Sequence, residues 1–239
     1  MKKIVLIAIS FLSVAAATAQ KKPKNFDGMM GRAGDHIMVQ LTSDHWMGAP
    51  DSINRHINSL SRGANVYVMM DRPFKGNPHM SAAFGVGIGT SNMYFKNMGV
   101  DIRSTTSYLP FQNQDTLDHF KKYKLTTAFL EVPVELRFTS KPGNDAKSIK
   151  GALGVKVGTL LSAHTKGKSP EDKNGKAINA YTQKEISKRF FNSTRLEATA
   201  RIGYGHFSLF GSYQINSIFK DGVAANIKLL QVGICISGL

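Results

Sequence analysis

Apolar and polar residues alternate along much of this chain, most clearly over residues 190–239. The first stretch contains an apolar set and a set of charged or small residues, namely Leu196, Ala198, Ala200, Ile202 and Tyr204 against Arg195, Glu197, Thr199, Arg201 and Gly203. Successive side chains of a β-strand point to opposite faces, so this period of two predicts a strand with one apolar face. The pattern returns at 207–215 and 230–236. Three such strands predict part of a transmembrane β-barrel wall.

Five further segments carry the same alternation, at 35–46, 63–74, 80–95, 123–138 and 149–165. The sequence therefore predicts an all-β protein, an antiparallel transmembrane β-barrel of about eight strands. Long hydrophilic connections at 47–62, 96–121 and 166–188 alternate with short turns near Gly76, Gly143 and Gly205. Outer-membrane barrels have short periplasmic turns and long extracellular loops, so this spacing fits a periplasmic N-terminus.

The first residues are typical of an exported protein. Lys2 and Lys3 precede an apolar run at 4–14, and small residues at 17–19 form a cleavage site, which predicts a signal peptide at 1–19. Residues 20–34 are basic and lack periodicity, and we expect them to form a periplasmic lead-in. We expect residues 35–239 to form one barrel domain in the outer membrane of a Gram-negative cell. No other stretch has the roughly 20 apolar residues of a membrane helix.

Four stretches carry a resemblance to a known family: RGANVY at 62–67, GVGIG at 85–89, LEVPVELR at 130–137 and RIGYG at 201–205, followed by FSLF at 207–210. With them the chain resembles the outer-membrane β-barrel family of Bacteroidota that includes the PorT-type proteins. The resemblance covers most of the chain after the signal peptide. It implies a barrel in the cell envelope and, for the PorT-type members, an association with a secretion system.

Seven charged residues fall on the predicted inner face: Glu131, Glu135, Arg137, Lys156, Arg195, Glu197 and Arg201. The interior of an eight-stranded barrel is just filled by side chains, and buried charges are costly unless they pair. We therefore expect a luminal salt-bridge network, with an ion-conducting path as the alternative. The glycines at 85, 87, 89, 154, 158 and 203 fall on the same face and would leave space for these side chains.

Other candidate chemistry is weaker. The GVGIG stretch lacks the Gly-Lys-Ser/Thr of a phosphate-binding loop. Ser162 and His164 share a face that the alternation predicts to be inward, but no third group orients the histidine. Asp115, Asp118 and His119 lie in a polar loop, where such residues are usually solvated, and the histidines lack zinc-site spacing. We expect no catalytic, cofactor or metal site, and Cys235, as the single cysteine, excludes an intramolecular disulfide.

The net charge of +15 favours anionic partners. The third long loop is basic, which predicts either contact with lipopolysaccharide phosphates or a solvated loop. The export signal argues against nucleic acid. We expect a monomer in contact with outer-membrane lipid, lipopolysaccharide and an envelope protein, with a structural or interaction role that includes PorT-like secretion. The alternatives are a narrow, porin-like channel and, third, a lipid-modifying barrel enzyme; our expectation is that the protein is not an enzyme.

Overall fold

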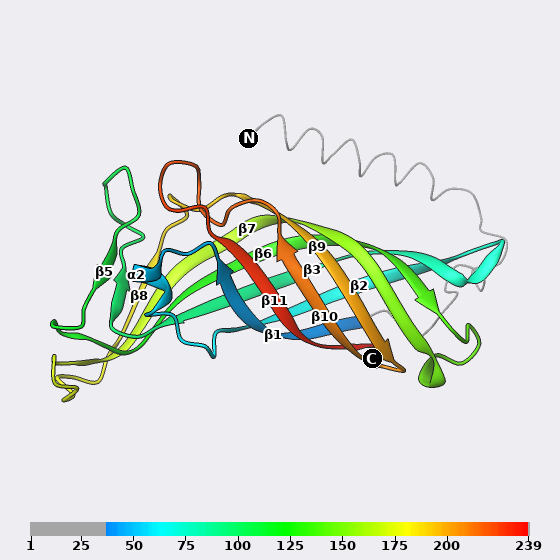
Figure 1. Cartoon of the computed structure of the whole chain (residues 1–239), viewed down its shortest axis with the longest axis horizontal. Coiled ribbons are helices and arrows are strands. Elements are labelled where there is room, and N and C mark those ends of the chain that lie inside the picture. Colours follow the sequence, from blue (N-terminus) through cyan, green and yellow to red (C-terminus); the bar gives the residue numbers. More distant parts are fainter. Residues whose placement is uncertain (1–36, 239) are drawn as a thin grey trace, which may run out of the picture. The chain divides into compact units, whose positions relative to one another are not determined.

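The computed structural model describes residues 37–238. The expected signal peptide at 1–19 and lead-in at 20–34 lie outside the described residues. Within the described part, eight strands alternate in direction and close into a barrel (Figure 1). Their bounds are β1 (Ile37–Met47), β2 (Arg62–Phe74), β3 (Asn77–Phe95), β6 (His119–Thr139), β7 (Ile149–Glu171), β9 (Thr194–Tyr204), β10 (Phe207–Gln214) and β11 (Lys228–Ser237).

Every neighbouring pair in the barrel is antiparallel, and β1 pairs with β11 to close the ring. The predicted fold, about eight antiparallel strands, is therefore confirmed. Closure matters because a strand edge without partners cannot be hydrated inside a membrane. No helix among the described residues has the length and apolarity needed to cross a bilayer.

The two faces of the wall differ as the alternation predicts. On β6, Glu131 is fully buried whereas Val132 is 48% exposed, and Glu135 is buried beside an exposed Val134. The other barrel strands also carry exposed apolar residues on the outside, among them Val66 on β2 and Ile234 on β11. Exposed apolar side chains at alternate positions around a closed barrel form a lipid-facing belt, which is typically about 25 Å tall. We call this surface the apolar belt.

The connections fall at two ends of the barrel. Short turns join β2 to β3, β6 to β7 and β9 to β10, and the second contains the short 3-10 helix η2 (Asp145–Lys147). The opposite, long-loop end carries α2 (Asp51–Asn54), β4 (Met98–Val100), β5 (Phe111–Asn113) and β8 (Thr182–Ile186). Figure 1 shows α2, β5 and β8 together at that end.

Two expectations about β7 were wrong. The segment 166–188, expected as a loop, continues β7 to Glu171 and then adds β8, which pairs with β7 from His164 to Lys168. Ser162 and His164, expected inside, lie outside, because β7 has a bulge where Phe129 pairs with Leu160 and Ala128 with Ser162. A bulge inserts one residue and so reverses which face later residues occupy.

An aromatic cluster closes the barrel interior at the long-loop end. Trp46 makes edge-on ring contacts with Phe95 and Phe219, at centroid distances of 5.6 and 5.7 Å, and Phe191 packs on Phe219 at 5.3 Å. Met93, Leu125 and Phe129 of the wall are buried in the same cluster. We call this the aromatic cap. It connects the long loops to the strands as one packed core.

Candidate functional site: the charged lumen and the long-loop end

The barrel interior below the aromatic cap holds a compact group of four charged side chains from three adjacent strands. Glu131 of β6 forms an ion pair with Arg195 of β9 and lies 3.8 Å from the Lys156 Nζ of β7. Lys156 Nζ lies 2.7 Å from Glu197 Oε2, and Arg195 Nε lies 3.1 Å from Glu197 Oε1. All four residues are buried. Two carboxylates and two cations balance, and we call this group the charge quartet.

The remaining three predicted residues form a second group nearer the short-turn end. Glu135 Oε2 lies 2.8 Å from the Arg137 Nε and 2.9 Å from an Arg201 guanidinium nitrogen. Arg201 also donates to the Ser237 hydroxyl at 3.3 Å. The structure thus brings the seven charged residues together in two sets, and each set joins residues from more than one strand.

Glycines supply the space for the quartet. In the strand register, Tyr67, Gly87, Glu131, Gly158 and Arg195 lie side by side across β2, β3, β6, β7 and β9. Each glycine therefore separates two large polar side chains that reach across it, and a Cβ on Gly158 would lie 3.0 Å from the Glu131 Cγ. Gly89 is tighter, since a Cβ there would lie 2.6 Å from a Glu131 carboxylate oxygen. The inward glycines are spacers for long side chains.

Two members of this site were not identified from the sequence. The Tyr67 hydroxyl donates to Glu131 at 2.5 Å and accepts from Lys156 Nζ at 3.3 Å. The Arg195 guanidinium lies 4.3 Å from the centre of the Phe129 ring, a cation–π distance. The alternation places both side chains on the inner face, and this is the only feature of the sequence that points to their presence in the site. Their contacts depend on the register between strands, which the alternation does not give.

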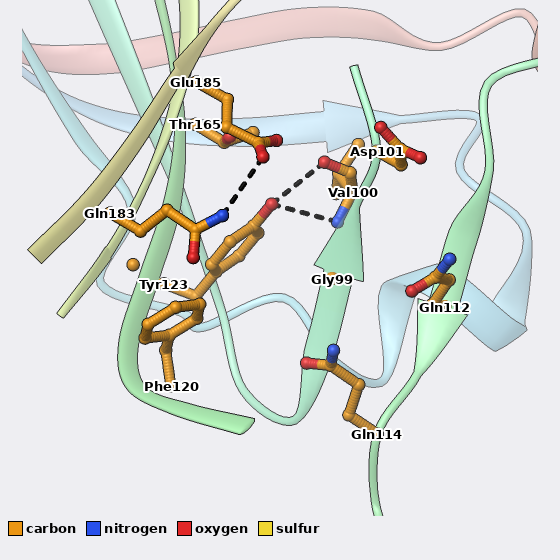
Figure 2. Close-up of a pocket in the computed structure, with 11 residues that line it drawn as sticks. Gly99, Val100, Asp101, Gln112, Gln114, Phe120, Tyr123, Thr165, Gln183 and Glu185 are labelled. Carbon is orange, nitrogen blue, oxygen red and sulfur yellow. Dashed lines mark hydrogen bonds between the residues drawn. The ribbon is translucent and has the colours of Figure 1, made fainter. Parts of the chain in front are cut away.

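Outside the lumen, the long-loop end contains an open cavity of about 230 Å³ between the β4–β5 hairpin and the inward faces of β6, β7 and β8. Figure 2 shows Tyr123 at its centre, with its hydroxyl bonded to the backbone N–H and C=O of Val100 at 3.1 and 2.9 Å. Gln183 donates to Glu185 at 3.1 Å on the β8 side. Phe120 stacks on Tyr123 at a centroid distance of 6.1 Å. The lining is chiefly polar and can offer hydrogen bonds to a small polar molecule.

The outward face of the same strand extensions is basic. Lys124 of β6 pairs in register with Lys166 of β7, and Lys166 pairs with Lys184 of β8. Lys122 and Lys168 form a second such pair. Directly opposite residues of antiparallel strands point to the same face, with Cβ atoms about 4.5–5.5 Å apart. These five lysines therefore form one patch, which we call the lysine row.

The family model described as "Outer membrane protein beta-barrel domain" matches residues 19–220. The chain belongs to this outer-membrane β-barrel family. Its location in the outer membrane follows, and the barrel architecture then places the short turns in the periplasm and the long loops outside the cell. The cavity and the lysine row of this outer-membrane barrel therefore face the outer side.

Solved structures similar to the outer-membrane barrel include two of Ail, the attachment invasion locus protein of Yersinia pestis. The crystal structure of Ail with the heparin analogue sucrose octasulfate has 13% sequence identity and a TM-score of 0.34, covering 84% of this chain and 95% of Ail. The other Ail crystal structure has 13% identity, the same coverage and a TM-score of 0.33. Likeness at this level carries no inference about ligands. A search of curated proteins finds no match.

The weaker candidate sites can also be located in the outer-membrane barrel. Ser162 and His164 both lie outside, and among the described residues no hydrogen bond joins them. In the loop, hydrogen bonding from Asn97 lowers the pKa of the Asp115 carboxyl, which lies 3.8 Å from the His56 Nε2. No group of three or more metal-ligating side chains occurs among the described residues.

Proposed function

We propose that this outer-membrane barrel is a monomeric, non-conducting protein with a structural or interaction role. Its interior is held by paired charges, and its long-loop end offers the surface on which contacts are made. The observation that carries the proposal is the charge quartet: Glu131, Lys156, Arg195 and Glu197 occupy the lumen as a balanced, buried set beneath the aromatic cap.

A conducting path needs ions to replace water step by step with groups that hold them only weakly. The quartet does not provide such weak sites for ions, because its carboxylates are already paired with the fixed cations of Lys156 and Arg195. Phe129, which contacts Arg195, also belongs to the aromatic cap, and the cavity between the cap and Arg195 holds only about 10 Å³. An ion would have to break buried pairs whose separated charges are strongly unfavourable in a low-dielectric interior.

Planar-bilayer recording of the folded full chain tests this proposal. We expect no stepwise conductance at protein levels where a general porin, run in parallel, gives clear steps. Heat-modifiable gel migration would verify that the protein in the bilayer is folded. Stepwise conductance that disappears in Glu135→Gln or Arg201→Gln variants would overturn the proposal and favour the alternative, a narrow porin-like channel.

An enzymatic role is not part of the proposal. The candidate Ser162 and His164 point outward, and within the described part of the chain no hydrogen bond joins them, which does not favour a lipid-modifying barrel enzyme. A lipid-modifying activity of the purified protein that is lost in Ser162→Ala would reverse this view.

A finer proposal concerns partners. The resemblance at 62–67, 85–89, 130–137 and 201–205 supports a PorT-like, secretion-associated role in Bacteroidota, in contact with an envelope protein. Crosslinking in intact envelopes, followed by purification and mass spectrometry, would test it. Recovery of secretion-system components would support the role, whereas recovery of lipopolysaccharide and unrelated abundant envelope proteins alone would count against it.

A further inference from the structure

The lysine row crosses three neighbouring strands, β6, β7 and β8, and Tyr94 of β3 lies next to it. Tyr94 of β3, Lys124, Lys166 and Lys184 lie side by side in the register from β3 through β6 and β7 to β8. Lys124 Nζ lies 5.6 Å from the centre of the Tyr94 ring, and the Arg62 guanidinium of β2 lies 5.7 Å from the same centre. The cationic surface therefore extends around the outer face of the wall from β2 to β8, and the Tyr94 ring lies between Arg62 and Lys124.

Nothing within the described protein neutralises this row. Like charges directly opposite each other on neighbouring strands are destabilising. None of the five lysines forms a salt bridge with a described residue, and Lys124 is bonded only to a neutral partner, the Asn92 side chain, at 2.7 Å. The nearby acids are directed elsewhere: Glu185 lines the cavity on the other face of the sheet, and Glu171 is paired with Lys121 at 3.1 Å. Within the described residues the row is therefore a cationic surface with no carboxylate paired to it, which favours anionic ligands.

The position of the lysine row relative to the apolar belt indicates which kind of anion it can bind. On β6 the outward positions that follow Ala128, at the edge of the apolar belt, are Thr126, Lys124 and Lys122. At about 3.3 Å per residue along a strand tilted by about 45°, Lys124 lies roughly 10 Å and Lys122 roughly 15 Å beyond Ala128 along the barrel axis. They point sideways, away from the barrel axis, so a neighbouring lipid meets the belt with its acyl chains and the lysines with its headgroup.

We propose that the lysine row binds the phosphate groups of lipopolysaccharide in the outer leaflet. This deepens the proposed interaction role by assigning one partner to named residues. The row holds several ammonium groups at the spacing of neighbouring strands, and each is a mobile point donor suited to phosphate oxygens. A soluble phosphate would satisfy the lysines but not the adjoining apolar surface, whereas lipopolysaccharide contacts both.

The experiment compares lipopolysaccharide retention by the full-length protein in nanodiscs, counted by native mass spectrometry. The row variant is K124Q/K166Q/K184Q, and the matched control is K75Q/K141Q/K147Q, which removes the same charge from exposed positions at the short-turn end. We expect the row variant to retain lipopolysaccharide about tenfold more weakly than the wild type and the control to match the wild type. Lipopolysaccharide stripped of its lipid A phosphates should bind the wild type as weakly as intact lipopolysaccharide binds the row variant.

A conservative variant keeps the test decisive. K124R/K166R/K184R preserves the charge and should retain lipopolysaccharide, and heat-modifiable migration verifies folding of every variant. Undiminished retention by the row variant, an equal loss in the short-turn control, or indifference to dephosphorylation would each overturn the proposal. Conductance measures the lumen alone, so a failure here is distinguishable from a failure of the non-conducting barrel.

Discussion

The charge quartet and the lysine row are both built from side chains that neighbouring strands hold in register, yet they treat charge in opposite ways. Inside, the register order is Tyr67, Gly87, Glu131, Gly158 and Arg195, so acids, cations and spacers alternate. Outside, Lys124, Lys166 and Lys184 follow one another with neither spacer nor acid. The same sheet geometry gives a balanced charge quartet inside and a row of unpaired lysines outside.

The difference shows where neutralisation is available. All four residues of the quartet are buried, so a charge there must find its partner within the chain or remain unpaired at a large cost. The lysine row lies at a surface where water, salt and lipid headgroups supply counter-charge, and screening over about 10 Å weakens repulsion between lysines. Removing a charge should therefore be destabilising inside and nearly neutral or stabilising outside.

The largest expected effect is the loss of the central carboxylate. Glu131→Gln leaves Arg195 and Lys156 with one acid between them, and we expect it to lower the free energy of unfolding by about 3–5 kcal/mol. Urea titration of the protein in lipid vesicles, followed by the fluorescence of the single tryptophan, Trp46, would measure the change. Glu171→Gln is the control, because its partner Lys121 is 63% exposed and such pairs contribute about 1 kcal/mol or less. Equal losses in the two variants would contradict the distinction between inside and outside.

The second group should be less sensitive. Arg201→Gln removes one cation from Glu135, which still has the Arg137 Nε at 2.8 Å. We expect a loss of about 1.5–3 kcal/mol, the usual contribution of a hydrogen bond to a charged group. The same titration would measure it. A loss larger than that of Glu131→Gln would mean that the second group, rather than the quartet, is the main stabilising set in the lumen.

The sequence predicts which face of a strand a residue occupies, but it does not predict the partner that the residue contacts. The face of Glu131 or Arg195 follows from a period of two, and the barrel follows from eight such segments. Their pairing could not be predicted, since Arg195 reaches Glu131 across Gly158 only when three strands take one register. Beyond the apolar belt the alternation disappears: both faces of β7 near Lys166 carry polar or small residues, and such a pattern predicts a loop. The bulge near Ser162 has no signature in the pattern of apolar and polar residues, so the outward direction of Ser162 and His164 could not be predicted.

The spacer glycines give a smaller effect. Gly89→Ala would bring a methyl group to 2.6 Å from a Glu131 carboxylate oxygen, and the side chain is already fixed by Arg195 and Tyr67. We expect a loss of about 1–2 kcal/mol from this crowding. Gly76→Ala, in the β2–β3 turn with no atom within 4 Å of the added group, is the control and should lose less. In a Glu131→Ala background the cost of Gly89→Ala should shrink, because the clashing group is gone; an unchanged cost would assign the crowding to another neighbour.

The smallest expected effect has the opposite sign. In phosphate-free lipid at low salt, K124Q/K166Q/K184Q should raise the free energy of unfolding by a few tenths of a kcal/mol up to about 1 kcal/mol, because like charges opposite one another are destabilising. The gain should fade as salt is added, since the lysines are exposed to solvent. In lipid with intact lipopolysaccharide the sign should reverse, because the wild-type row then gains bound phosphate that the variant cannot hold. A variant that is destabilised equally in both lipids would show that the lysines stabilise the folded sheet and do not act by binding phosphate. The lysine row would then resemble the quartet.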